Sequence, residues 1–171
     1  MAKKRKSAIT PVAKVLFAAL GVAFGLILCR ALVVSCAVGD TSMQPAVPRG
    51  ARVFAWRFAS PKAGDIVIAA HPDDKGKALV KRVVACGEDI VEFRNKVLYI
   101  NQEKASEDIQ GVLSDERIFP MGFTNRDTMP ALHLERDSFF LLGDNRDNSY
   151  DSRELGAFKK SNIKGVVFFV F

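Results

Sequence analysis

The sequence predicts a mainly β fold, an antiparallel β domain preceded by one N-terminal transmembrane helix. Three observations support this fold class. An apolar stretch with a single interior arginine runs from Val15 to about Val38. Five later segments are short, rich in β-branched or aromatic residues, and bounded by Gly, Pro or Asn, as strands are. About 130 residues follow the apolar stretch, enough for one compact core.

The N-terminal stretch has the composition of a membrane anchor. Val15–Cys29 is uncharged, but its 15 residues fall short of the roughly 20 that a spanning helix needs. The apolar residues after Arg30 complete the length, because an arginine near a helix end can extend its guanidinium to the interface. We therefore expect a cytoplasmic basic stub at 1–14, a transmembrane signal anchor at 15–37 and an extracytoplasmic domain at 38–171.

The distribution of charge orients this anchor and argues against one class of partner. Of the 25 basic residues, six precede Asp40, and none of the 19 acidic residues does. Four of the six form the cluster KKRK, which places the N-terminus in the cytoplasm by the positive-inside rule. The remaining domain is electrically balanced, whereas nucleic-acid binding needs a basic face. We expect no nucleic-acid partner.

Two processed forms of the N-terminus remain open. The small residues of SCA suit a signal-peptide cleavage site, and VVSC loosely resembles a lipoprotein acceptor ending in Cys36. An ordinary signal peptide has a shorter apolar region without an interior arginine, so we favour a retained anchor. Export permits disulfides, but the sequence leaves open whether Cys36 and Cys86 pair.

Five segments after the anchor are predicted strands. They are DIVIAA, ALVKRVVAC, DIVEFRNKVLYIN with a bend at Arg94-Asn95-Lys96, SFFLLG and GVVFFVF. Between residues 102 and 137 the chain is polar and shows no clear period. We expect an inserted loop or small subdomain there.

A serine in a proline-stiffened turn, Ser42 of SMQP, directly follows the anchor. A serine hydroxyl is a weak nucleophile unless a positioned base takes its proton. The two histidines, His71 and His133, lie in polar, loop-like segments, so we expect no Ser-His-Asp triad. The other base open to serine is a lysine whose pKa burial has lowered until its amine is neutral.

Lys81 has the position that such a base requires. In the segment LVKRVVA, strand alternation places Lys81 on one face with Leu79, Val83 and Ala85, and Arg82 on the other face. A lysine on an apolar face is either buried as the neutral amine or extends its charge to water. The other motifs of the chain favour the buried form.

A charged turn at residues 141–156, LLGDNRDNSYDSRELG, directly follows an apolar strand. Gly, Asp and Asn at this place favour a tight turn. We expect paired charges to hold the turn rigid. The members of this lattice are Asp144, Arg146, Asp151 and Arg153.

Taken together, these stretches resemble the type I signal peptidases, the membrane-anchored Ser-Lys proteases that remove signal peptides from exported proteins. The resemblance rests on the anchor followed in order by SMQP, PKAGDIVI, VKRVVA and GDNRDNSYDSR. It implies the mostly β signal-peptidase fold, with Ser42 as the nucleophile and Lys81 as the general base. Ser149 matches the serine that orients that lysine, and Asp151 and Arg153 match a structural ion pair. Asp144, Asn145 and Arg146 are expected to support the site.

The same resemblance implies the substrate and the location. Signal peptides of exported preproteins would be cut after small residues, at sites of the A-x-A type, and we expect Val38, Met43 and Val80 near the pockets that select them. The implied location is the bacterial cytoplasmic membrane, with a single pass, a cytoplasmic N-terminus and a catalytic domain outside. No cofactor and no metal are implied.

Asp40 departs from the family pattern, which often has Ser, Thr or Gly two residues before the nucleophile. A hydroxyl or a backbone N–H at that place helps to hold the oxyanion, whereas an ionised carboxylate cannot donate a hydrogen bond. The short turn after Gly39 can aim a carboxylate at solvent or at a nearby arginine. We therefore expect Asp40 to point away from the site.

Two other functions fit part of the sequence. One is a dedicated Ser-Lys maturation peptidase for a single pilin-like or conjugation protein. The other is a membrane-tethered β domain that binds peptides without cutting them, and the presence of both Ser42 and Lys81 argues against it. Activity on a model preprotein separates these alternatives.

Overall fold

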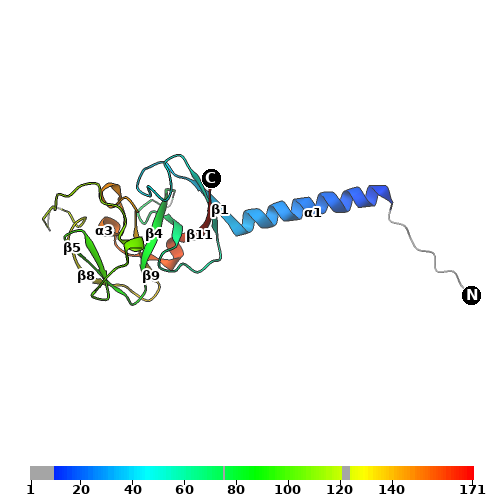
Figure 1. Ribbon diagram of the computed structural model, residues 1–171. Coiled ribbons are helices and arrows are strands. Elements are labelled where there is room, and N and C mark those ends of the chain that lie inside the picture. Colours follow the sequence, from blue (N-terminus) through cyan, green and yellow to red (C-terminus); the bar gives the residue numbers. More distant parts are fainter. Residues whose placement is uncertain (1–9, 75, 121–123) are drawn as a thin grey trace, which may run out of the picture.

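A long helix projects from a body of β-strands (Figure 1). The computed structural model describes residues 10–74, 76–120 and 124–171. Within these ranges the strands form two antiparallel sheets, one of seven strands and one of four, and the mainly β fold with one N-terminal apolar helix is confirmed. The predicted KKRK orientation signal lies outside the described residues, as does most of the predicted basic stub.

Helix α1 spans Pro11–Leu32, and none of its residues is buried against the rest of the protein. Proline at its start has no N–H, so it removes one of the first-turn N–H groups that would lack an intrahelical acceptor. At 1.5 Å per residue its 22 residues measure about 33 Å, close to the thickness of a bilayer's hydrocarbon core. The helix is therefore long and apolar enough to cross a membrane.

The helix ends five residues before the predicted limit of the anchor. Val33–Ala37, which the sequence analysis placed in the spanning segment, forms strand β1. This strand pairs with β2, Arg52–Trp56, along its whole length. β-branched Val33 and Val34 favour the extended backbone, and the partner strand satisfies their peptide groups. Apolar composition alone does not distinguish the two conformations.

The seven-stranded sheet carries the site. Its strand order is β1-β2-β11-β3-β4-β9-β10, and every pair is antiparallel. Four of the predicted segments fall on it. The remaining strands are β3 (Ile66–Ala70), β4 (Ala78–Cys86), β9 (Ser138–Leu142), β10 (Phe158–Lys159) and β11 (Ile163–Val170).

The four-stranded sheet, β7-β6-β5-β8, packs at the end of the body away from α1 (Figure 1). The predicted bend at Arg94-Asn95-Lys96 is a hairpin turn, with positive φ at Asn95 and Lys96, as primed hairpin turns require. The predicted insertion at 102–137 supplies β7, a short helix and β8; its residues 121–123 lie outside the described ones. The elements are β5 (Ile90–Arg94), β6 (Val97–Ile100), β7 (Glu103–Lys104), α2 (Glu107–Gln110) and β8 (Met129–His133).

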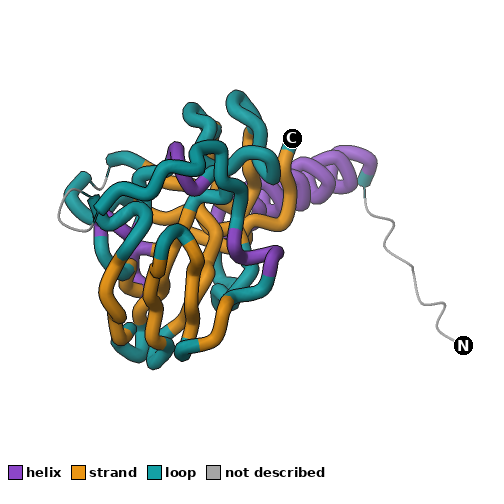
Figure 2. The backbone as a smooth tube through the Cα atoms, turned by 60° about the vertical axis from the view of Figure 1, so that its left-hand side comes forward, coloured by secondary structure: helices purple, strands orange, loops and turns teal. Residues whose placement is uncertain are grey.

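Three clusters of buried apolar side chains form the core (Figure 2 shows the strands around it). One joins the smaller sheet to β4 and β9 through Val84, Phe93 and Phe140. A second cluster packs the turn after β1, which contains Ser42, on the larger sheet through Met43. The short helices η1 (Arg146–Asn148), α3 (Ser152–Leu155) and η2 (Lys160–Asn162) lie in the connections after β9.

A group of exposed aromatic side chains lies beside the strand that continues α1. β11 pairs with β2, and β2 pairs with β1. The C-terminus accordingly lies near the junction of α1 and β1 (Figure 1). The exposed residues are Trp56, Phe58, Phe168, Phe169 and Phe171. They form the aromatic edge of the domain.

Candidate active site

Ser42 and Lys81 meet inside the larger sheet, although 39 positions separate them in sequence. Ser42 lies in the turn after β1, and Lys81 lies at the centre of β4. The Lys81 Nζ is 2.6 Å from the Ser42 Oγ. Both residues are buried, with 3% and 2% of their surfaces exposed. The geometry therefore joins a hydroxyl to an amine that is shielded from water.

Burial lowers the pKa of the Lys81 amine below its ordinary value. The Lys81 side chain lies on a face of β4 that is covered by the turn carrying Ser42, and only 2% of the residue is exposed. Asp40, Asp151 and Asp144 act in the opposite direction and raise the pKa, and Arg153 lowers it further. The net effect favours the neutral amine, the form that accepts a proton.

The predicted alternation along β4 holds for Leu79 and Val83, which share one core cluster. Ala85 departs from it and packs with Val84 in another cluster. The pairing with β9 shifts between Val83 and Ala85, because a bulge there interrupts the period of two. The bulge lies beyond Lys81 and leaves its orientation unchanged.

The turn after β9 holds the Ser42 turn from the other side. The backbone N–H of Asn145 donates to the carbonyl oxygen of Ser42 at 2.9 Å. The side-chain amide of Asn148 donates to the Thr41 hydroxyl at 2.6 Å. Gly143 permits this approach, because a Cβ there would collide with the Ser149 side chain and the Ser42 carbonyl oxygen.

Asp144 pairs with Arg82, which was not a member of the predicted lattice of charges. The Arg82 guanidinium donates to both carboxylate oxygens at 2.7 and 2.6 Å. It also donates to the Gly64 carbonyl oxygen. A bidentate pair of this kind fixes direction as well as distance, so it ties the start of the turn to the strand that carries Lys81.

Asp151 and Arg153 form the expected ion pair. Arg153 Nε and Nη2 each lie 2.9 Å from a carboxylate oxygen of Asp151. Burial opposes ionisation of Asp151, but Arg153 and hydrogen bonds, one from the Gly143 N–H, lower its pKa overall. Asp151 also caps α3 together with Glu154. The pair therefore fixes the backbone on both sides of Ser149.

Arg146 has no carboxylate partner among the described residues, contrary to the predicted lattice. It is buried, and its guanidinium donates to the carbonyl oxygens of Gly143 and Ile109. Burial lowers its pKa to about 10. Backbone carbonyls thus take the place of an acidic partner, and the Arg146 side chain joins the turn to α2.

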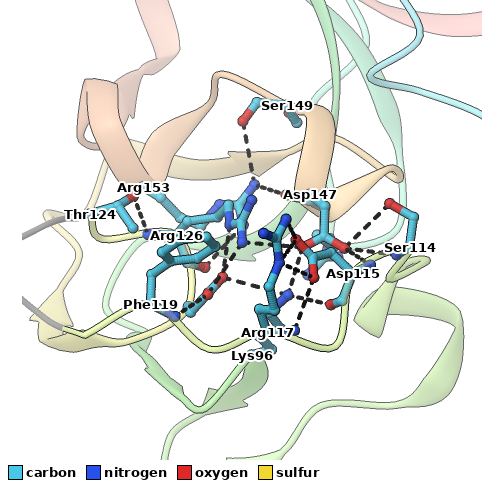
Figure 3. A network of polar contacts seen from close by, with 12 residues as sticks. Lys96, Ser114, Asp115, Arg117, Phe119, Thr124, Arg126, Asp147, Ser149 and Arg153 are labelled. Atoms are coloured by element: carbon cyan, nitrogen blue, oxygen red, sulfur yellow. Dashed lines mark hydrogen bonds and ion pairs between the residues drawn. The ribbon is translucent and has the colours of Figure 1, made fainter.

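A buried ionic network that the sequence analysis missed supports the same turn (Figure 3). Lys96, in the hairpin turn between β5 and β6, donates to Asp147 at 2.9 Å and lies 3.9 Å from Asp127. Asp147 accepts hydrogen bonds from the backbone N–H groups of Ser114 and Asp115. No sequence period marks Lys96, because a lysine in a hairpin turn is ordinarily exposed.

An open cavity of about 400 Å³ borders Ser42 and Lys81. The Ser149 Oγ is buried there, with no hydrogen-bond partner among the described residues, but near enough to Asp151 to lower that carboxyl's pKa. Tyr150 stacks on His71 at the same cavity. The lining is Asp40, Ser42, His71, Lys77, Leu79, Lys81, Asp147, Asn148, Ser149 and Tyr150.

The three residues predicted to lie near the substrate pockets belong to the core next to Ser42. Val38, Met43 and Val80 pack together in one core cluster, and Met43 is fully buried. None of the three lines the cavity within the described part of the chain. Their apolar character serves the packing of the turn that contains Ser42, and Leu79 is the apolar wall beside Lys81.

Asp40 points at Ser42, and the expectation that it points away from the site is wrong. Its Oδ1 accepts the backbone N–H of Ser42 at 3.0 Å and the Ser42 hydroxyl at 2.7 Å. An aspartate readily bonds the backbone two residues on. Burial opposes ionisation, but these hydrogen bonds and the nearby charges of Lys81 and Lys77 lower the Asp40 pKa overall.

The three cysteines, Cys29, Cys36 and Cys86, are all described and all free. Cys36 lies on β1, where its thiol donates to the Ala37 carbonyl oxygen. The possible bond to Cys86, which the sequence left open, is not formed in this structure.

Known proteins similar to this chain fall in one family. The family model described as signal peptidase, peptidase S26, matches residues 9–171. Signal peptidase I of Bacillus amyloliquefaciens is 32% identical over 172 residues, which cover 98% of this chain and 90% of that protein. Signal peptidase I of Bacillus licheniformis is 34% identical over 141 residues, covering 78% and 74%. The solved structure of a signal peptidase I from Enterococcus faecalis V583 is 30% identical, with a TM-score of 0.50, and covers 64% of this chain and 98% of its own.

The first prediction concerns the contribution of Lys96 to thermal stability. Lys96→Met keeps the length of the side chain but removes the ammonium that lies 2.9 Å from the buried carboxylate of Asp147 and 3.9 Å from that of Asp127, which leaves Arg126 as the cation near both. Breaking a buried pair costs about 3–5 kcal/mol, so we expect thermal unfolding of the full chain in detergent to begin earlier, with a Tm lower by roughly 10 °C. Lys104→Met, at an exposed position on β7, is the control. Equal Tm values for the two variants would contradict the structural role of Lys96.

Proposed function

The chain belongs to the signal peptidase family, peptidase S26, and we propose that Ser42 and Lys81 are the nucleophile and general base of its reaction. The relatives described above are signal peptidases, and the chain is a serine endopeptidase that removes signal peptides. The observation that carries the residue assignment is the 2.6 Å contact between two buried groups, the Lys81 Nζ and the Ser42 Oγ.

The proposed reaction begins when the Ser42 Oγ attacks the carbonyl carbon of the scissile bond. Lys81 takes the hydroxyl proton, and the carbonyl oxygen becomes an oxyanion. When the tetrahedral intermediate collapses, the C–N bond breaks and Lys81 gives its proton to the leaving amine. The product of this half is the signal peptide esterified to Ser42.

Hydrolysis of this ester repeats the proton transfers with water. Lys81 removes a proton from the water as its oxygen attacks the ester carbonyl. The proton then passes to the Ser42 Oγ as the ester bond breaks, and the signal peptide leaves as a carboxylate. Burial that keeps the Lys81 amine neutral serves both halves of the reaction.

Ser149 is proposed to orient the Lys81 amine during these transfers. It lines the same cavity as Lys81, and its buried hydroxyl has no hydrogen-bond partner in the described structure. A buried hydroxyl without a partner is unfavourable, so an amine that turns towards it gains a hydrogen bond. The ion pair of Asp151 and Arg153 holds the backbone from which this hydroxyl projects.

The proposed location is the bacterial cytoplasmic membrane, with the N-terminus inside and the catalytic domain at 38–171 outside. The basic cluster before α1 supports this orientation. The aromatic edge of the domain supports contact with the bilayer surface, since Trp and other aromatic side chains favour that interface. Substrate and enzyme then share one bilayer, which raises their effective concentration.

The proposed substrates are the signal peptides of exported preproteins, cut after small residues at A-x-A sites. The support is membership of a family whose relatives are signal peptidases. Leu79 and the stacked pair of His71 and Tyr150 border the cavity at the dyad, and side chains that border a binding site can select small residues by excluding larger ones. The comparison that tests the assignment is cleavage of a preprotein with alanine or with leucine before the scissile bond.

Loss of either dyad residue is expected to abolish cleavage of a model preprotein. Because nucleophile and base act as a unit, the Ser42→Ala and Lys81→Ala losses should not add. Lys81→Arg should be equally inactive, since a guanidinium is not deprotonated in a protein. Ser60→Ala and Lys62→Ala, at exposed positions, are the matched controls. A double variant clearly slower than both single variants argues against the dyad.

The pH dependence follows from the lowered Lys81 pKa. The protonated amine cannot act as base, so cleavage should be absent at low pH and should rise as pH passes through the Lys81 pKa. Because that pKa is lowered, the rise should be complete below the ordinary lysine value of about 10.4. Single-turnover rates across the pH range measure this limb. A limb at the ordinary lysine value would contradict a desolvated base.

Ser149→Ala is expected to slow the chemical step by about 10²-fold, within the range of general-base effects. The half-saturating substrate concentration should change little, because the hydroxyl acts on the lysine and not on substrate binding. Single-turnover kinetics separate the two quantities. A rate equal to that of the unaltered chain removes Ser149 from the site.

A further inference from the structure

Asp40 accepts hydrogen bonds from two groups that the proposed reaction needs for other purposes. The backbone N–H of Ser42 and the hydroxyl of Ser42 both point to its Oδ1. In acyl transfer, a backbone N–H beside the nucleophile is the group that stabilises the oxyanion. A carboxylate that accepts this N–H therefore occupies the place that the oxyanion must take.

The proton of the Ser42 hydroxyl is also hydrogen-bonded to Asp40. A serine hydroxyl has one proton, and an ionised carboxylate has none. The 2.7 Å contact between the Ser42 Oγ and the Asp40 Oδ1 is a hydrogen bond only if that proton points to Asp40. Lys81, 2.6 Å from the same oxygen, must then act as a donor. Base catalysis requires the reverse, with the proton pointing to the Lys81 nitrogen.

The Asp40 carboxylate has room to move away from Ser42, and Lys77 is a cation with which it can then pair. Asp40 is exposed, and Gly39 beside it has no other atoms within 4 Å of the place where a Cβ would stand. Lys77 lines the same cavity and carries an exposed side chain. It precedes β4 and shares the alternation of Leu79 and Lys81, so its ammonium faces the space in front of Asp40.

We propose that Asp40 is a positioning residue with two settings, a proposal that rests on the Ser42 and Lys81 roles given above. In the resting enzyme its carboxylate closes the oxyanion site and holds the serine proton away from Lys81. The carbonyl oxygen of bound substrate displaces the carboxylate, which swings to Lys77. The Ser42 N–H is then free for the oxyanion, and the serine proton is free to reach Lys81.

Several charged or titratable groups face this carboxylate and set its surroundings. Lys81 and Lys77 act on it directly. Asp40 in turn raises the pKa of Lys81, so removal of its charge should lower that pKa and shift the acid limb of the rate profile to lower pH. The other groups around the dyad or cavity are His71, Asp144, Asp147, Tyr150, Asp151 and Arg153.

Asp40→Ser and Asp40→Asn test the closed setting in the full chain in detergent. Both remove the charge, and both can donate a hydrogen bond to the oxyanion. We expect the single-turnover rate on a preprotein to rise about tenfold at neutral pH, with little change in the half-saturating concentration. The affinity for a peptide aldehyde ending in alanine, whose adduct with Ser42 presents the oxyanion, should rise by a similar factor. Asp73→Asn, an exposed acid on the loop before β4, should change neither.

Lys77→Met tests the open setting. We expect it to slow cleavage several-fold in the unaltered chain and to have no effect in the Asp40→Ser background, where no carboxylate needs a partner. Lys62→Met, an exposed lysine outside the cavity, is its control. An equal loss in both backgrounds would show that Lys77 acts on substrate, and would overturn its role as the receiving cation.

The outcomes separate this proposal from the dyad itself. If Ser42→Ala is inactive while both Asp40 variants keep the rate, the aldehyde affinity and the acid limb of the unaltered chain, the dyad stands and the two settings of Asp40 are wrong. Asp40 variants that lose activity without a change in Tm would also overturn the proposal, because Asp40 would then assist the reaction. Faster cleavage with a shifted acid limb supports it.

Discussion

The burial of Lys81 is the constraint on which the rest of the structure depends. An ammonium group is strongly disfavoured in an apolar interior, so the groups packed on this face of the larger sheet must cover Lys81 and still leave one opening for substrate. Ser42 and Leu79 lie beside it at the cavity. Burial thereby lowers the pKa of the amine that we propose as the general base.

The turn after β9 holds Ser42 beside Lys81. Its backbone binds Ser42 through Asn145, and its acids and arginines bind three different parts of the chain. Asp144 reaches β4 through Arg82, Arg146 reaches α2, and Asp147 reaches the hairpin of the smaller sheet through Lys96. The smaller sheet, remote from the chemistry, therefore stabilises the geometry of the site.

Sequence patterns predicted the elements well where a local rule decided them. Alternation placed Lys81 on the face of Leu79, and apolar composition found α1, although not its end at Leu32. Partners set by tertiary packing were beyond such rules. The buried role of Lys96 and the choice of Arg82 as the partner of Asp144 depend on which loops meet in space. The orientation of Asp40 was predicted wrongly. The sequence does not show whether its carboxylate points to solvent or accepts hydrogen bonds from Ser42, two residues on, that the reaction also needs.

The direct passage from α1 to β1 has a consequence for where cleavage occurs. Leu32 ends the helix and Val33 begins the strand, so no flexible joint separates the membrane segment from the domain. At about 3.3 Å per residue, β1 extends roughly 17 Å before the chain turns to Ser42. With α1 in the bilayer, the fixed length of this strand sets the distance between the membrane surface and Ser42. A scissile bond at the proposed nucleophile, Ser42, would then lie at a set height above the membrane.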